Sequence, residues 1–402
     1  MGLTRPKYYS GGGTPDLVSK LSSYPKEFDV ENKGTPINGT QAHVRYAVLR
    51  TNSHQILDIV TKKEKDPKSS SLNNEVQKSR SIKKHAGYEK IKNHLSLPFH
   101  SEFRNSGMEA YSRLKINGDL ESHSHFIQNN SSSDEGINYI FHQTRNIVNT
   151  LNSLHNGDFL DDNEKMHKSI IHDDIKPDNI LMGKNGELSL SDFGSARYVD
   201  EPIEQPGLVS YLSPELLKIY SGEIPSNSNS GKSDIWSLGL TLQSTLTGKC
   251  PIESCSQTAI DSINSMSKDT NGYIIRENKP TPLDQEVYTE ELADEKLSYP
   301  GIVHEPLQVQ QTREKVDKYL QSETCKNLES KKIIEDLCQN SSHDKIDKSV
   351  ILGHLTSSML LPEEQRPTAE NLSETMNKLA PYFLCDQKNN FEFVKKNDRR
   401  EK

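Results

Sequence analysis

The stretch of sequence that decides the fold is residues 171–181, which reads IHDDIKPDNIL. A second piece, residues 191–194, reads SDFG, and the turn signal Asn185-Gly186 lies between the two. Short apolar runs on either side of an Asn-Gly pair predict a β-hairpin. We therefore expect residues 170–192 to form a hairpin that brings the two pieces close together.

The polar groups of these two pieces are those that phosphoryl transfer requires. A carboxylate such as Asp174 orients an acceptor hydroxyl and accepts its proton late in the reaction. Lys176, two residues further on, has the positive charge that neutralises a γ-phosphate. Magnesium prefers hard oxygen ligands, which Asn179 and Asp192 supply from either side of the expected hairpin. The spacing therefore predicts one site with a base, a cation and two metal ligands.

This pattern resembles that of the eukaryotic-type protein kinases, in which an H-R-D-L-K-P-x-N catalytic loop precedes a D-F-G metal-binding turn. The D-F-G piece begins thirteen residues after Asn179. The resemblance implies that Asp174 is the catalytic base and Lys176 the cation on the phosphate side. It also implies that Asn179 and Asp192 bind Mg2+, that ATP is the phosphate donor, and that the acceptor is a Ser or Thr hydroxyl of a protein substrate.

Other segments resemble the rest of this family, in the family's order. The tripeptide Ser213-Pro214-Glu215 resembles the A-P-E that ends the activation segment. Asp234 opens a segment, DIWSLG, that resembles a helix start whose Asp braces the catalytic loop. The resemblance also implies that Arg366 pairs with Glu215. Together these motifs cover residues 137–251 well and 350–375 adequately.

The amino-terminal part resembles the family less closely. The family has a lysine on its third strand that holds the α- and β-phosphates, and Lys62 is our choice because Val60 then shares its strand face. Lys63 is the alternative, since a slip of one residue exchanges the two faces. Glu75 is the candidate partner of that lysine, or otherwise one charge on a solvated helix face.

The glycine-rich loop of the family is hard to recognise in this chain. Gly34 and Gly39 precede a β-prone run, but the pattern G-x-G-x-x-G is absent. Pro36 removes one backbone donor that would face a phosphate. The stretch is therefore either a phosphate cover that contributes to nucleotide binding or an ordinary turn.

Two residues beside the catalytic loop depart from the family pattern. Asp173 replaces the Arg of H-R-D, so the cation that usually receives an activation-loop phosphate is missing. We therefore expect that this phosphorylation switch is not used. Leu208 replaces a Thr that usually contacts the catalytic Asp and Lys in Ser/Thr kinases. Substrate docking beside Asp174 is expected to differ for that reason.

The resemblance implies an α+β, bilobal protein kinase-like fold with a small β-rich N-lobe and a larger helical C-lobe. We expect a flexible leader at residues 1–40, a kinase domain at 41–384 and a charged tail at 385–402. A polar insertion at 252–345 falls where the family binds substrates and partners. The expected lobes are the N-lobe at 41–116 and the C-lobe at 117–384.

The composition of the chain excludes other classes of function. A net charge of −8 argues against a nucleic-acid-binding protein that works through bulk charge. Five cysteines without metal-ligand spacing indicate free thiols in a reducing compartment. No run approaches the ~20 apolar residues of a transmembrane helix, and the first residues lack a secretory signal. We expect a monomer that works in the cytoplasm or is delivered into a host cell without a signal peptide.

Two hypotheses of function follow. The first is an active Ser/Thr protein kinase, because all four polar groups of the catalytic loop and the metal turn are retained. The alternative is a pseudokinase scaffold, which the weak glycine loop, Asp173 and Leu208 favour. The small N-lobe, the Asn/Lys/Ser-rich composition and the insertion also resemble effector kinases that intracellular bacteria deliver into host cells, which implies a host protein as substrate.

Overall fold

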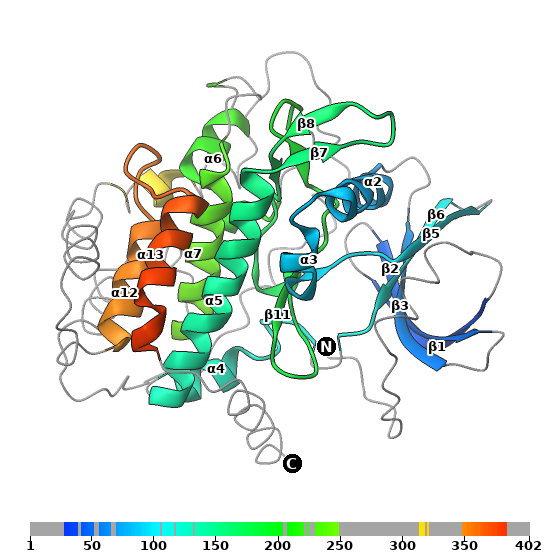
Figure 1. Cartoon of the computed structure of the whole chain (residues 1–402), viewed down its shortest axis with the longest axis horizontal. Coiled ribbons are helices and arrows are strands. Elements are labelled where there is room, and N and C mark those ends of the chain that lie inside the picture. Colours follow the sequence, from blue (N-terminus) through cyan, green and yellow to red (C-terminus); the bar gives the residue numbers. More distant parts are fainter. Residues whose placement is uncertain are drawn as a thin grey trace.

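The chain folds into a β-sheet lobe and a helical lobe, with α2 and β11 between them (Figure 1). The structure is a computed structural model. It describes residues 28–38, 42–51, 56–65, 70–104, 107–115, 118–131, 133–203, 207–220, 223–224, 230–248, 313–317, 320 and 348–383.

A five-stranded antiparallel sheet forms the first lobe, in the order β1-β2-β3-β6-β5. The runs of β-prone residues around 44–48 and 56–60 lie in β2 and β3. Their register sets Val44 opposite Lys62. The strands are β1 (Phe28–Asn38), β2 (Ala42–Thr51), β3 (Ile56–Glu64), β5 (His100–Arg104) and β6 (Gly107–Arg113).

Strand β1 lies where the sequence predicted a flexible leader, and that prediction is wrong for residues 28–38. Phe28 pairs with Thr51, and the register shifts once between Lys33 and Ile37. Val30 packs against the buried residues of the sheet while its neighbours along the strand are exposed. This alternation is the ordinary pattern of a half-buried strand, but here it is too short to stand out beside Gly, Ser and Pro. The rest of the predicted leader lies outside the described residues.

Helix α2 (Ser71–Lys84) packs on the sheet and then leads into shorter turns. The polar stretch of the sequence between residues 71 and 94 is helical in separate pieces. It contains α2, the short α3 (Tyr88–Ile91) and the 3-10 turn η1 (Lys92–His94). The apolar contact of α2 with β6 is small, and consists of Leu72, Val76, Met108 and Ala110.

The second lobe is built around α5, one face of which is apolar and buried. Ser133 caps this helix by accepting a hydrogen bond from the N–H of Gly136. Buried residues of α5, α7, α12 and α13 share one hydrophobic core, and Figure 1 shows these four helices side by side. The helices are α4 (Ser124–Asn130), α5 (Asp134–His155), α6 (Pro214–Tyr220), α7 (Lys232–Thr247), α12 (Lys348–Met359) and α13 (Ala369–Leu379).

Short strands between the lobes position the catalytic loop. The predicted hairpin is confirmed for residues 180–191, where β10 pairs with β11 and Gly186 in the turn has a φ of 78°. Ile170 and Ile171, which the prediction included, pair with residues 197–198 instead. The loop lies between β9 and β10, and Asp192 follows β11 directly. The short strands are β4 (Leu95–Ser96), β7 (Asp158–Leu160), β8 (Met166–Lys168), β9 (Ile170–Ile171), β10 (Ile180–Met182), β11 (Leu188–Ser191) and β12 (Arg197–Tyr198). The 3-10 turns are η2 (Pro177–Asn179) in the catalytic loop, η3 (Val209–Tyr211) before α6, and η5 (Ala380–Tyr382) after α13.

Most of the predicted insertion at 252–345, and the predicted tail at 385–402, lie outside the described residues. Within the insertion, residues 313–317 are helical, and Val316 is buried in a cluster that also contains Trp236 and Leu360. This part of the insertion therefore belongs to the core of the helical lobe. Among the described helices, none combines the length and the apolar character needed to cross a membrane.

Candidate active site

Strand β3, helix α2 and the end of β11 bring three charged side chains together. Nζ of Lys62 donates hydrogen bonds to Oε2 of Glu75 at 2.8 Å and to Oδ1 of Asp192 at 2.7 Å. Of the two candidate lysines, Lys62 is therefore the one that lies against Glu75. Lys63 makes no such contact with any described residue. Glu75 is buried, so its alternative reading as a charge on a solvated helix face does not fit this geometry.

The charges of this group support one another in a buried setting. Burial raises the pKa of Glu75, and Asp192 raises it further, while Lys62 opposes both effects. Burial alone would lower the pKa of Lys62, but the carboxylates of Asp192 and Glu75 outweigh it, so the pKa of Lys62 is raised. Burial likewise disfavours the charge of Asp192, yet Lys62 holds its pKa below the ordinary value. Lys62 is therefore a cation and Asp192 an anion at neutral pH.

Asp174 lies in the catalytic loop and is oriented by three donors. Nζ of Lys176 donates to its two carboxylate oxygens at 3.2 and 2.9 Å. Nδ2 of Asn179 donates to its Oδ2 and to its backbone oxygen, both at 2.8 Å. The backbone N–H of Leu208 donates to its Oδ1 at 3.1 Å. Burial disfavours the charge of Lys176, but Asp174 and then Asp192 raise its pKa above the ordinary value.

Asp234, in the first turn of α7, holds the backbone of the catalytic loop. Its carboxylate accepts hydrogen bonds from the N–H of His172 at 2.8 Å and of Asp173 at 2.9 Å, and Nε2 of His155 lies 2.9 Å from it. The bracing role that the family resemblance implied is confirmed. Asp173 has a φ of 57°, a strained conformation for a residue other than Gly, and these two bonds stabilise it.

His172 joins the catalytic loop to the segment around Asp192. The imidazole is fully buried, with Nε2 at 3.0 Å from the carbonyl oxygen of Ser191. Its ring centroid lies 4.7 Å from that of Phe193. Asp192, between Ser191 and Phe193, has a φ of 59°. The backbone conformation that turns Asp192 toward Lys62 is therefore stabilised through its two neighbours, because His172 contacts both Ser191 and Phe193.

The two candidate metal ligands, Asn179 and Asp192, are adjacent but have no direct contact. Oγ of Ser191 donates to the backbone oxygen of Asn179 at 3.0 Å, which links the two segments. Asn179 uses its amide nitrogen on Asp174, and Asp192 uses Oδ1 on Lys62. Within the described chain no hydrogen bond reaches Oδ1 of Asn179 or Oδ2 of Asp192. Two oxygens are thus available, and they are donors that suit magnesium.

Of the two candidate glycines, the structure describes only the backbone of Gly34. Gly34 lies in β1, in the interval between Lys33 and Ile37 where the pairing register shifts. Gly39 lies outside the described residues. The role of either residue in covering a phosphate stays a prediction.

Sequence reasoning missed how closely Gly207 approaches the catalytic loop. A Cβ added at Gly207 would lie 2.6 Å from the carbonyl oxygen of Asp173 and 2.7 Å from Oδ1 of Asp174. Only glycine fits this position without displacing the loop. The next residue, Leu208, lacks the expected Thr hydroxyl but supplies its backbone N–H to Asp174 instead. The only indication of this close approach in the sequence was that a glycine, Gly207, directly precedes Leu208.

Sequence reasoning also missed a partner for Asp173. Nε of Arg197 lies 2.7 Å from Oδ2 of Asp173, and their side chains are only 5% and 1% exposed. The guanidinium also donates to the backbone oxygen of Glu201 at 3.0 Å. Burial raises the pKa of Asp173 to about 7, and Asp234 adds to this, while Arg197 opposes it. The charge reversal at position 173 is thus matched by a cation inside the protein.

Glu215 and Arg366 form the ion pair that the family resemblance implied, and the prediction is confirmed. Nη1 and Nη2 of Arg366 donate to the two carboxylate oxygens at 2.5 and 3.2 Å. Both residues are buried, and the guanidinium lies 5.0 Å from the ring centroid of Trp236. The pair ties the end of the activation segment to the helical lobe.

Comparison with known proteins agrees with this geometry. Serine/threonine-protein kinase 32B of Homo sapiens is 39% identical over 102 residues, which are 25% of this chain and 24% of that protein. A dual specificity mitogen-activated protein kinase kinase, dSOR1 of Drosophila melanogaster, is 32% identical over 163 residues, 36% of this chain and 38% of that protein. An Aurora kinase of Schizosaccharomyces pombe is 32% identical over 161 residues, 39% of this chain and 38% of that protein.

The chain thus spans well under half the length of each of these relatives. The match to a family model is much longer, because the protein kinase domain aligns with residues 38–390. That range contains most of the sheet, the catalytic loop and the helical lobe. The chain therefore belongs to the protein kinase domain family.

Proposed function

We propose that this protein transfers the γ-phosphate of ATP to Ser or Thr hydroxyls of a protein substrate. One observation carries the proposal: Lys62 bonds to both Glu75 and Asp192, while Lys176 and Asn179 orient Asp174. Cation, base and metal-ligand oxygens are therefore assembled in one place by contacts within the chain. Such preorganisation is the main contribution of a protein to phosphoryl transfer.

Each side chain has a distinct part in the proposed reaction. Asp174 accepts the proton of the substrate hydroxyl, whose oxygen forms a bond to the γ-phosphorus as the bond to the β,γ-bridging oxygen breaks and ADP leaves. Lys176 lies beside Asp174 and balances the charge on the transferred group. Lys62 holds the α- and β-phosphates, and Glu75 keeps Lys62 in position.

The residues present fit a magnesium ion. Asn179 and Asp192 would hold it with the two oxygens that make no other hydrogen bond within the described chain. When bound, magnesium neutralises charge on the phosphates. Two protein ligands are few, but magnesium usually takes its remaining ligands from water and from the phosphates of the nucleotide.

The pseudokinase alternative rests on three departures from the family pattern. Two of these departures are compensated within the chain. The acidic Asp173 is paired with Arg197, and the backbone N–H of Leu208 donates to Asp174 where the family usually has a Thr side chain. The third, the weak glycine loop around Gly34, has no replacement among the described residues. We therefore prefer the enzyme over the scaffold.

The test compares the wild type with Asp174→Asn, which keeps the size of the side chain and removes the base. Asp134→Asn is the control, because Asp134 is 84% exposed at the start of α5. Each protein is incubated with radiolabelled ATP, magnesium and casein, and labelled residues are identified by phosphoamino acid analysis. We expect phosphoserine or phosphothreonine from the wild type and the control only. A wild type that binds magnesium nucleotide but transfers no phosphate would leave the scaffold as the better reading.

The place of action is a further part of the proposal. We propose that the enzyme works in the cytoplasm of a host cell as a bacterial effector, on a host protein. The support is the small β-rich lobe and the Asn/Lys/Ser-rich composition. A translocation reporter fused to the chain tests this, and a fusion that stays inside the producing cell contradicts it.

A further inference from the structure

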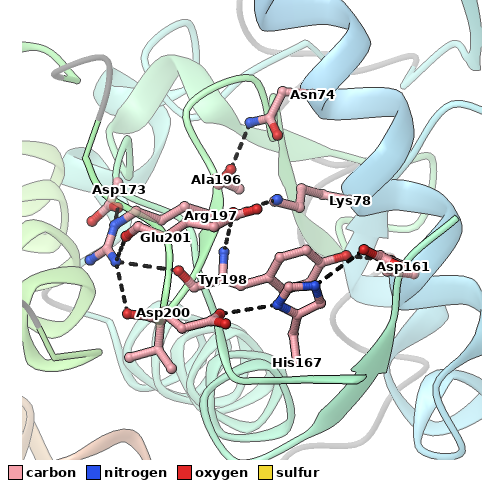
Figure 2. Close-up of polar contacts among 12 residues, drawn as sticks. Asn74, Lys78, Asp161, His167, Asp173, Ala196, Arg197, Tyr198, Asp200 and Glu201 are labelled. Atoms are coloured by element: carbon pink, nitrogen blue, oxygen red, sulfur yellow. Dashed lines mark hydrogen bonds and ion pairs between the residues drawn. The ribbon is translucent and has the colours of Figure 1, made fainter. Parts of the chain in front are cut away.

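Helix α2 is fixed to the segment that follows Asp192 by a polar network outside the catalytic group (Figure 2). We call this network the α2 anchor. It consists of Asn74 and Lys78 on α2 and of residues 194–201 facing them. Asn74 and Lys78 are four residues apart, so both lie on one face of the helix.

The first contact of the anchor is made by Asn74, the residue just before Glu75. Its Nδ2 donates hydrogen bonds to the carbonyl oxygens of Gly194 at 2.9 Å and Ala196 at 2.6 Å. Gly194 is also close to the start of α2, because a Cβ at this position would collide with Oγ of Ser71. The helix therefore rests directly on the backbone that carries Asp192.

The second contact is made by Lys78, one turn further along the helix. Its side chain is only 3% exposed, with Nζ at 2.7 Å from Oε2 of Glu201 and 3.8 Å from the ring centroid of Tyr198. Burial lowers the pKa of Lys78, and Glu201 opposes this. Glu201 also accepts a hydrogen bond from the N–H of Tyr198 at 2.8 Å. A buried lysine is costly unless it is paired, so this contact has a defined geometry.

Tyr198 connects the anchor to the β7–β8 hairpin. Its hydroxyl lies 2.5 Å from Oγ of Ser81 on α2, and its ring stacks on His167 with centroids 3.8 Å apart. Asp161 and Asp200 hold the two ring nitrogens of His167 at 3.2 and 3.1 Å, as Figure 2 shows. The ring of Tyr198, which Lys78 contacts, is thus held by Ser81 at its hydroxyl and by His167 at its face.

We propose that Asn74 and Lys78 are positioning residues of the kinase site, which hold α2 where Glu75 reaches Lys62. The apolar cluster that α2 shares with the sheet contains only Leu72, Val76, Met108 and Ala110, and the polar contacts of the anchor add to it on the side that faces residues 194–201. All groups of the anchor belong to the unmodified chain. This inference rests on the proposed function.

The sharpest probe is Asn74→Asp. Aspartate has almost the same size as asparagine but cannot donate, and its carboxylate would face the two carbonyl oxygens. Near the start of a helix a negative charge is favourable, so a loss of helix stability cannot explain a defect. Asn73→Asp is the matched control, because Asn73 is the exposed neighbour of Asn74. Lys78→Met removes a charge at similar length, and Lys78→Arg restores it.

Steady-state kinetics with varied ATP gives the decisive readout. We expect Asn74→Asp and Lys78→Met to lower kcat/KM for ATP roughly tenfold, since each lost hydrogen bond changes a population by a factor of about two to ten. Asn73→Asp should match the wild type, and Lys78→Arg should recover most of the loss. In a Glu75→Gln background, Asn74→Asp should have little further effect, because a positioning residue acts only through Glu75.

The outcomes separate this inference from the proposed function. If the wild type transfers no phosphate, the proposed function fails and the anchor has no catalytic role. If the wild type is active and Asn74→Asp equals Asn73→Asp, only the anchor is overturned. An equal loss from Asn74→Asp with and without Glu75→Gln shows a merely structural role, which also overturns it. Should Asn74→Asp not fold, the comparison of Lys78→Met with Lys78→Arg decides the question.

Discussion

The buried pair of Arg197 and Asp173 makes the stability of the protein depend on pH in a defined way. The informative change is Arg197→Met, which removes the guanidinium and keeps the length of the side chain. Asp173 then remains buried beside Asp234 and loses the guanidinium that lay 2.7 Å from its Oδ2. Removing one partner of a buried ion pair costs about 3–5 kcal/mol when the remaining charge cannot be neutralised.

The size of the loss follows from the protonation of Asp173. Burial and Asp234 raise its pKa to about 7 in the wild type although Arg197 opposes them, so loss of Arg197 raises this pKa further. Below pH of about 7 the carboxyl of either folded protein takes up a proton, and the variant loses only the hydrogen bonds of the guanidinium. Above it, the folded wild type releases the proton and the folded variant keeps it. The difference in unfolding free energy then grows by up to about 1.4 kcal/mol per pH unit.

Urea unfolding followed by the fluorescence of the single tryptophan, Trp236, measures this difference. Each protein is unfolded one pH unit below and one unit above the pKa of Asp173. The double variant Asp173→Asn/Arg197→Met is the control, because it has no titrating carboxyl at position 173. The difference in unfolding free energy between the wild type and this double variant should not grow by about 1.4 kcal/mol per pH unit above the pKa of Asp173. An Arg197→Met variant whose loss of stability is the same at both pH values would refute this account of the pair.

Two further changes test the surroundings of the site. Gly207→Ala should lower kcat roughly tenfold or more while leaving KM for ATP nearly unchanged, because the added methyl displaces the loop from Asp174. Gly353→Ala in α12 is its control, since nothing lies within 4 Å of a Cβ there, and steady-state kinetics on both variants decides the point. Deleting residues 257–306, which leaves Val316 in place, should spare autophosphorylation and weaken phosphorylation of the true substrate. Equal loss of both activities would contradict a role of the insertion in partner choice.

The parts of the site that the sequence predicted are those in which chemistry depends on short spacing. Asp174, Lys176 and Asn179 lie within six residues, so a local conformation is enough to bring them together. Asp192 comes within reach because the turn at Gly186 closes the hairpin, and that turn has a clear sequence signal. Such elements can be placed without knowledge of the tertiary structure.

The parts that the sequence could not predict depend on backbone groups or on weak local patterns. The N–H of Leu208 donates to Asp174 although its side chain suggests the loss of a contact. Every residue except proline has such a donor, so no letter of the sequence marks the one that is used. The sequence did not indicate strand β1 for a different reason: it is an edge strand, and Val30 is the apolar residue among those whose side chains are described. Residues 28–38 form a strand because they pair with β2, a tertiary contact that their own sequence does not indicate.

The position of Asp173 shows why a departure from a family pattern is hard to interpret alone. By itself, an acidic residue there indicates the loss of the cation that binds an activation-loop phosphate. Arg197, 24 residues later, does not stand out in the sequence either. In the structure the two form one buried pair, in which the carboxylate already holds a cation. Because the guanidinium of Arg197 is already paired with Asp173, this pair offers no free positive charge to a phosphate brought to this place. The pair therefore supports the expectation that this switch is not used, and it ties the catalytic loop to the segment that follows Asp192.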